Sequence, residues 1–131
     1  MKQSVAGIHY KDGTFLIGKR LPTGDMGNRW EFPGGKVDPG ETPKQALQRE
    51  FFEEMGVEVQ VGEQVAVAGF SHRDSPVRLE AYEVFIPDDT TVVLTEHTQL
   101  ARASLDDIEK MDFVDSDLLL VPLLRRWLEH D

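Results

Sequence analysis

Residues 34–56 read GGKVDPGETPKQALQREFFEEMG, a glycine-rich turn that leads into a helix pattern. Thr42 is the expected N-cap, Pro43 fits the first helical position, and Gln45 completes a capping box. Gly56 marks the end, because glycine readily adopts the left-handed conformation that closes a helix. We therefore expect a helix that begins at Pro43 and stops at Gly56.

This helix has an apolar and an acidic side. The apolar stripe recurs at every fourth position and consists of Leu47, Phe51 and Met55. On a wheel of about 100° per residue, Glu50, Glu53 and Glu54 fall within roughly 100° of one another. Glu54 lies about 60° from the Phe51 direction and Glu50 about 100°, whereas Glu53 points nearly to solvent. Two carboxylates should therefore flank the core.

Two interpretations of the acidic side remain. It is either an ordinary solvated helix face or a cation site. Arg49 can bind one of the carboxylates, but one guanidinium cannot neutralise all of them. Hard divalent cations take oxygen ligands, and magnesium bridges to substrate phosphates. The glycines at 34 and 35 favour the cation site, because a backbone without Cβ atoms can approach an ion or a phosphate.

The spacing of these residues resembles a complete Nudix box. Gly35 is followed after five residues by Glu41, and after seven more by REFFEEMGV at residues 49–57. The resemblance implies an α/β class with a mixed α+β sheet, arranged as a Nudix-type α/β/α sandwich. It also implies a single domain over residues 1–131 that hydrolyses a nucleoside diphosphate linked to another group.

Site roles follow from the resemblance by position. The implied metal ligands are the Gly34 carbonyl and the carboxylates of Glu50, Glu53 and Glu54. Arg49 and Glu41 would hold loop and helix in register. The implied catalytic residues are Arg49, Glu53 and Glu96. Either Glu53 or Glu96 is the general base, and the cofactor is Mg2+, with Mn2+ as the alternative.

Residues 16–20 (LIGKR) and 27–42 (GNRWEFPGGKVDPGET) resemble the MutT-type and CTP-pyrophosphohydrolase branch. In that branch Arg20 would contact phosphate, Lys36 would assist substrate binding, and Asp117 would bind the base. The alternative for Arg20 is a surface charge at a strand end. The alternative for Asp117 is charge complementation at a helix N-terminus. Relatives often carry an aromatic residue where this chain has Arg102.

Residues on the C-terminal side of the box narrow the substrate class. ADP-ribose-type members tend to carry a proline, and diadenosine-polyphosphate types a tyrosine, where residues 72–75 read HRDS. A nucleoside triphosphate is therefore expected, either an oxidised purine such as 8-oxo-dGTP or a cytidine nucleotide, giving a nucleoside monophosphate and pyrophosphate. The rival function is a Nudix domain that binds nucleotides without hydrolysing them, although the intact glutamate set argues against it.

Composition limits the partners. The chain has 131 residues and a formal net charge of -10, which disfavours polymeric nucleic acid. It has no cysteine and no apolar run long enough to span a membrane, so we expect a cytoplasmic enzyme with a small nucleotide substrate, as a monomer or homodimer. The four histidines are His9, His72, His97 and His130; they lack ligand spacing and are interpreted as isolated polar residues.

The remaining elements follow from alternation and turn signals. Residues 4–10 and 14–20 flank Asp12-Gly13 and predict a β-hairpin. Residues 57–70 and 78–86 alternate at period two and predict two or three strands. Ser104 begins a short helix, and residues 115–130 predict a longer terminal helix.

Overall fold

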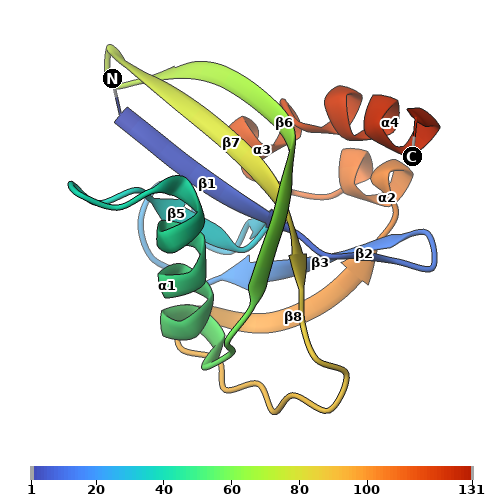
Figure 1. Ribbon diagram of the computed structural model, residues 1–131. Coiled ribbons are helices and arrows are strands. Elements are labelled where there is room, and N and C mark those ends of the chain that lie inside the picture. Colours follow the sequence, from blue (N-terminus) through green and yellow to red (C-terminus); the bar gives the residue numbers. More distant parts are fainter. Residues whose placement is uncertain (1, 131) are drawn as a thin grey trace.

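Two β-sheets make up the centre of the computed structural model, which describes residues 2–130 (Figure 1). The first sheet has the strand order β5-β1-β7-β6. In it, β1 (Lys2–Ile8) is parallel to β7 (Ser75–Phe85) and antiparallel to β5 (Gly34–Lys36). The long strand β6 (Gln60–His72) pairs with β7 in antiparallel register. This first sheet is therefore mixed.

The second sheet is antiparallel and is built around β3 (Thr14–Arg20). Strand β8 (His97–Ala103) follows one edge of β3, with a register shift between Lys19 and Arg20. The short strands β2 (Tyr10–Lys11) and β4 (Trp30–Glu31) share the other edge. The ends of β3, β4 and β8 that carry Arg20, Glu31 and His97 thus meet at one place.

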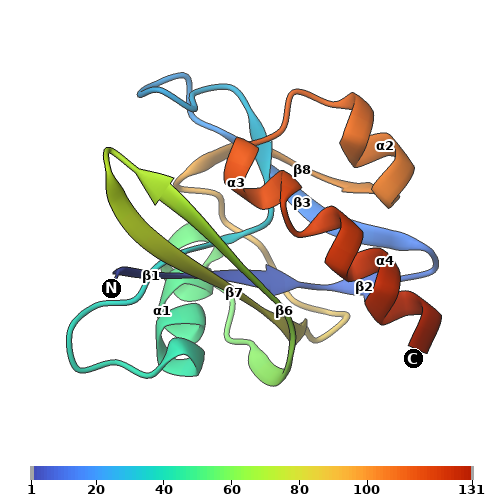
Figure 2. The same cartoon turned by 90° about the horizontal axis from the view of Figure 1, so that it is seen from above.

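Helices cover the sheets from two sides. Figures 1 and 2 show α1 (Pro43–Met55) on one side of β1, and α2 (Leu105–Lys110), α3 (Asp115–Leu118) and α4 (Val121–His130) on the other. Each side has its own buried apolar cluster, one including Leu47 and Phe51 and the other including Ile108 and Leu124. This layering confirms the mixed-sheet α+β class and the α/β/α sandwich. Within residues 2–130, no helix is both long and apolar enough to span a bilayer.

Helix α1 forms as its sequence predicts. The Thr42 hydroxyl accepts a hydrogen bond from the Gln45 N–H at 3.1 Å, and the Gln45 side chain accepts one from the Thr42 N–H at 2.9 Å. Gly56 closes the helix in the left-handed conformation, with φ 67°. Phe51 is fully buried and leaves no room for a Cβ at Gly7 of β1. The close approach of helix to sheet therefore depends on that glycine.

The expected hairpin at Asp12-Gly13 is only partly correct. The turn forms, with φ of 53° and 82°, but only Tyr10 and Lys11 pair across it with β3. Residues 2–8 turn away and pair with β5 and β7 instead. Strand β1 contributes to both apolar clusters, and a strand buried on both faces is a central strand that needs a partner along each edge.

The prediction of one continuous terminal helix over residues 115–130 is wrong. This segment is divided into α3 and α4 between Leu118 and Val121. Pro122 lies in the first turn of α4, where a missing N–H costs nothing, but it cannot continue a helix from upstream. The strands expected within residues 57–70 and 78–86 are confirmed as β6 and β7, joined by a tight turn.

Candidate active site

The three glutamates of α1 differ in burial as the helical wheel predicts. The side chain of Glu54 is 1% exposed, that of Glu50 is 13% exposed, and that of Glu53 is 50% exposed. Burial raises the pKa of Glu50 and, together with contact to Glu50, raises the pKa of Glu54. The acidic face is therefore partly desolvated and is not an ordinary solvated helix surface.

Arg49 links the glycine loop to the acidic face. Its Nε and Nη2 atoms donate to the two oxygens of Glu41 at 2.8 and 3.0 Å, and Nη2 also donates to the Lys36 carbonyl at 3.0 Å. Its hydrogen bonds hold the pKa of Glu41 below the usual range. Four carboxylates lie within ion-pair distance of Arg49: Asp38, Glu41, Glu50 and Glu53. One cation among so many anions leaves the cluster negative.

The glycine pair fits closely between β1 and α1. At Gly34, with φ 155°, a Cβ would collide with the Val5 carbonyl. At Gly35, a Cβ would lie 2.7 Å from Oε1 of Glu50. The Glu50 carboxylate therefore rests directly on the loop backbone, in a space that any other residue at position 35 would fill.

Replacing Gly35 by alanine is expected to lower kcat about 10- to 100-fold while changing stability by less than about 1 kcal/mol. The new methyl group meets the flexible end of Glu50, so the carboxylate moves and the backbone does not. Pyrophosphate release and urea unfolding measure the two effects. The matched control is Gly69→Ala, where the nearest atom to a Cβ is 4.0 Å away and no loss is expected. Equal activity in both variants would contradict this role for Gly35.

Glu96 joins the acidic face from another part of the chain. Thr95 donates from its backbone N–H to the Glu54 carbonyl at 3.1 Å and from its hydroxyl to the Glu53 carbonyl. This contact fixes the segment before β8 against the end of α1. Glu50, Glu54 and Glu96 then offer ligand oxygens that lie within 4.8 Å of one another. The carboxylate of Glu53 is outside that group and lies 3.1 Å from Arg49.

The group has the properties of a site for a hard cation. All the side-chain atoms that could bind a cation in this group are carboxylate oxygens, which Mg2+ and Mn2+ prefer as ligands. Neither oxygen of Glu54 has a hydrogen-bond partner among the described residues, although both are buried. A buried carboxylate without partners is costly unless a cation compensates it. The residues present therefore fit a divalent cation.

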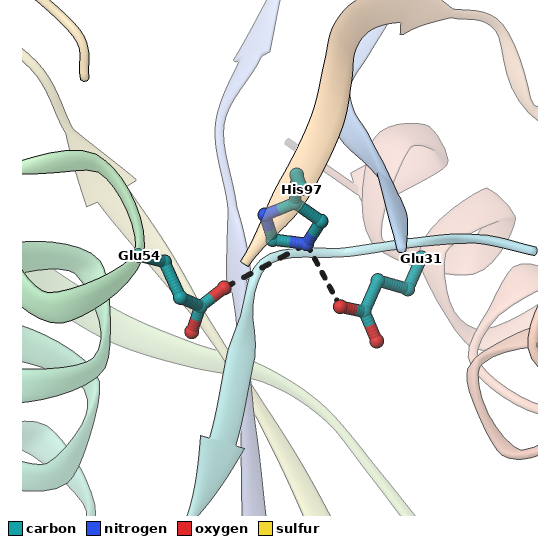
Figure 3. A group of neighbouring side chains, drawn as sticks. All are labelled: Glu31, Glu54 and His97. Carbon is teal, nitrogen blue, oxygen red and sulfur yellow. Dashed lines mark hydrogen bonds and ion pairs between the residues drawn. The ribbon is translucent and has the colours of Figure 1, made fainter. Parts of the chain in front are cut away.

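A second polar group lies beside the first and was missed by sequence reasoning (Figure 3). The interpretation of His97 as an isolated polar residue is wrong: its ring is 0% exposed, and Nε2 lies 2.8 Å from Oε2 of Glu31. Arg20 donates to the other Glu31 oxygen at 2.9 Å, so it is paired and is not a free surface charge. The ligand-spacing test failed because these residues are far apart in sequence and meet only through strand pairing.

Asp117 is buried at the start of the C-terminal helices. Its Oδ2 accepts a hydrogen bond from the Phe32 N–H at 3.0 Å, next to Glu31. Burial, and then the charge of Glu31, raises the pKa of Asp117 to about 7. A carboxyl group near its midpoint at neutral pH can donate or accept a hydrogen bond. The Lys36 side chain, by contrast, is exposed at the end of β5.

Asp117→Asn is expected to make the protein more stable than the wild type, and this difference in stability should grow as the pH rises. Folded Asp117 holds a proton that the unfolded chain releases above its ordinary pKa of 3.8, so the wild type loses stability up to pH 7. At about 1.4 kcal/mol per unit, the advantage of Asp117→Asn grows by about 2 kcal/mol between pH 5.5 and pH 8. Urea unfolding at both pH values measures it. Exposed Asp115→Asn is the control, and a pH-independent difference would show that Asp117 ionises normally.

Arg102 lies away from the acidic groups. It donates to the Thr14 hydroxyl and to the carbonyls of His9 and Thr14, each at 3.0 Å, and so ties β8 to the β2–β3 turn. A groove of about 460 Å³ beside it is lined by residues that include Met55 and Leu100. The position where relatives often have an aromatic residue therefore has a structural role here.

Comparison with known proteins agrees with this geometry. The sequence model of the NUDIX domain matches residues 2–129. The CTP pyrophosphohydrolase of Escherichia coli strain K12 is 36% identical over 129 residues, covering 98% of this chain and 92% of the relative. A protein of Mycobacterium tuberculosis described as putative 8-oxo-dGTP diphosphatase 2 is 32% identical over 120 residues, covering 86% and 80%.

A solved structure supports the same family assignment. The solution structure of the E. coli ORF135 protein superposes with a TM-score of 0.83 at 34% identity, covering 96% of this chain and 89% of that one. The family match spans the Gly34–Lys36 strand, all of α1 and the segment that carries Glu96. The chain therefore belongs to the Nudix family and is a Nudix pyrophosphohydrolase.

Proposed function

We propose that this protein hydrolyses a nucleoside triphosphate to a nucleoside monophosphate and pyrophosphate with the help of a divalent cation. The observation that carries the proposal is the buried Glu54 carboxylate, which has no hydrogen-bond partner among the described residues and lies beside Glu50 and Glu96. The relatives named for CTP and for 8-oxo-dGTP support a triphosphate substrate. A cytidine nucleotide and an oxidised purine are the two candidate substrates.

Glu50, Glu54 and the Gly34 carbonyl would hold Mg2+ or, as the alternative, Mn2+. Glu96 would be the third carboxylate ligand in place of Glu53, which the sequence resemblance implied. When bound, the cation supplies positive charge to the phosphate oxygens and makes a water molecule easier to deprotonate. We assign proton removal to Glu53, because Glu96 is grouped with Glu50 and Glu54 whereas Glu53 is not. The water oxygen bonds to phosphorus, the anhydride bond breaks, and Glu53 takes the proton.

Substrate recognition is assigned to the edge formed by β4 and α3. Arg20 would contact the phosphates, and this requires its Nη1 to share or leave Glu31. Lys36 is free to approach the phosphates from the loop end. Asp117 would bind the base, and its raised pKa supports recognition of a base that presents both donors and acceptors. Both candidate bases have this property, so Asp117 alone does not select between them.

The test is release of pyrophosphate from 8-oxo-dGTP, dGTP, CTP, dCTP and 5-methyl-dCTP. ADP-ribose is the out-of-class compound, and its hydrolysis is followed as formation of AMP. We expect release from one triphosphate, dependent on Mg2+ and abolished by EDTA. Formation of AMP and ribose 5-phosphate from ADP-ribose, without turnover of any triphosphate, would replace the proposed substrate class. Binding of nucleotides by folded protein without turnover of any would contradict hydrolysis and favour the regulatory binder.

A further inference from the structure

A second ligand group lies next to the Glu50–Glu54–Glu96 group, around the buried ring of His97 (Figure 3). Nε2 of His97 lies 2.8 Å from Oε2 of Glu31 and 3.8 Å from Oε1 of Glu54. The three residues come from β8, β4 and α1, and each offers a ligand atom within 4.8 Å of the others. Glu54 belongs to both groups.

The hydrogen bond between Nε2 of His97 and Oε2 of Glu31 accounts for only part of this arrangement. Glu54 is 1% exposed, and neither of its oxygens has a hydrogen-bond partner among residues 2–130. The 3.8 Å between Oε1 of Glu54 and Nε2 of His97 is too long for a hydrogen bond. The buried Glu54 carboxylate therefore meets the His97 imidazole at ion-pair distance and not through a hydrogen bond.

The spacing suits an ion between the three side chains. Ligand atoms bonded at about 2.1 Å to one ion lie about 3.0 Å apart at right angles and about 3.4 Å apart in a tetrahedron. The separations of 2.8 and 3.8 Å from Nε2 bracket these values. Small rotations of the two carboxylates are sufficient, and the backbone need not move.

The surroundings hold the ligands in place. A Cβ at Gly18 would lie 2.6 Å from Cδ2 of His97, so the glycine in β3 makes room for the ring. Arg20 donates to Oε1 of Glu31 at 2.9 Å and leaves Oε2 directed at the histidine. Such contacts behind the ligands orient metal-binding side chains in proteins.

We propose that Glu31, Glu54 and His97 form a second divalent-cation site that shares Glu54 with the first and prefers a first-row transition ion to Mg2+. The preference follows from the imidazole nitrogen, which suits transition ions, whereas sites made only of oxygen ligands suit magnesium. A carboxylate shared between two cations is typical of two-metal phosphoryl-transfer sites. The inference rests on the cation-dependent hydrolysis proposed above.

The experiment is Mn2+ binding to the nucleotide-free protein, followed by electron paramagnetic resonance. We expect a Mn2+ ion with coupling to a directly bonded nitrogen, retained in a tenfold excess of Mg2+. Labelling the histidines with 15N must change that coupling, and this arm needs no variant. His97→Gln and Glu31→Gln should each lower the Mn2+ affinity of this site at least about 10-fold. The matched control is His72→Gln, at an exposed histidine, which should bind as the wild type does.

The possible results separate this site from the proposed reaction. Absence of nitrogen coupling in the wild type, or its persistence in folded His97→Gln protein, would overturn the second site; His97 would then be an ion-pair partner of Glu31. Pyrophosphate release is measured on the same samples. Hydrolysis without nitrogen coupling would contradict only the proposed second site. Nitrogen coupling without hydrolysis would contradict only the proposed reaction.

Discussion

Replacing Glu54 by glutamine is expected to abolish hydrolysis, with kcat falling about 1,000-fold, and at the same time to stabilise the metal-free protein by about 1–3 kcal/mol. The carboxylate is buried with both oxygens unpartnered among the described residues, so its charge is a cost to the fold unless a cation is bound. Because the pKa of Glu54 is raised, the stability gained in the glutamine variant depends on pH. This gain should be small near pH 4.5 and should increase as the pH rises. Unfolding in EDTA and pyrophosphate release in Mg2+ measure the two effects.

Added Mg2+ should reverse the order of stability. A cation that binds only the folded state stabilises the wild type, and the glutamine variant gains less. Glu58→Gln is the control, because Glu58 is exposed just beyond α1 and should affect neither quantity. A Glu54→Gln protein that is less stable than the wild type in EDTA would show that Glu54 is a structural residue with partners of its own.

The sequence predicts α1 almost completely because the signals for it are local. The Thr42 cap, the Gly56 stop and the burial order of Glu54, Glu50 and Glu53 depend only on spacing along one helix. The resemblance to the Nudix box extends this to the family, which the match over residues 2–129 confirms. Local periodicity and a long motif are therefore sufficient for the centre of this fold.

The parts that sequence reasoning missed depend on tertiary contacts. No spacing rule connects Glu31 with His97, because β3 must lie between β4 and β8 before the two side chains meet. In the same way, the sequence predicts residues 4–10 as a hairpin strand, but residues 2–8 pair with β5 and β7 and contribute to both apolar clusters. The only local hints were Gly18, which makes room for the ring, and a glutamate between the apolar residues Trp30 and Phe32.

The proposed assignment of the general base to Glu53, and not to Glu96, is based on their positions relative to the other carboxylates. Glu96 shares the neighbourhood of Glu50 and Glu54, which suits a ligand. Glu53 is held by Nη1 of Arg49 at 3.1 Å and is half exposed, so it retains lone pairs that can take a proton from a water molecule. Removing a metal ligand lowers the affinity for the cation, whereas removing a general base does not.

Glu53→Gln is therefore expected to lower kcat about 100- to 10,000-fold with little change in Mg2+ affinity, because glutamine keeps the shape but cannot accept the proton. The stability of the variant should stay within about 0.5 kcal/mol of that of the wild type, as for most half-exposed positions. Glu96→Gln should instead weaken Mg2+ binding, so that a higher Mg2+ concentration restores much of its kcat. Steady-state kinetics at several Mg2+ concentrations measure both variants. If high Mg2+ restores Glu53→Gln and not Glu96→Gln, the two assignments must be exchanged.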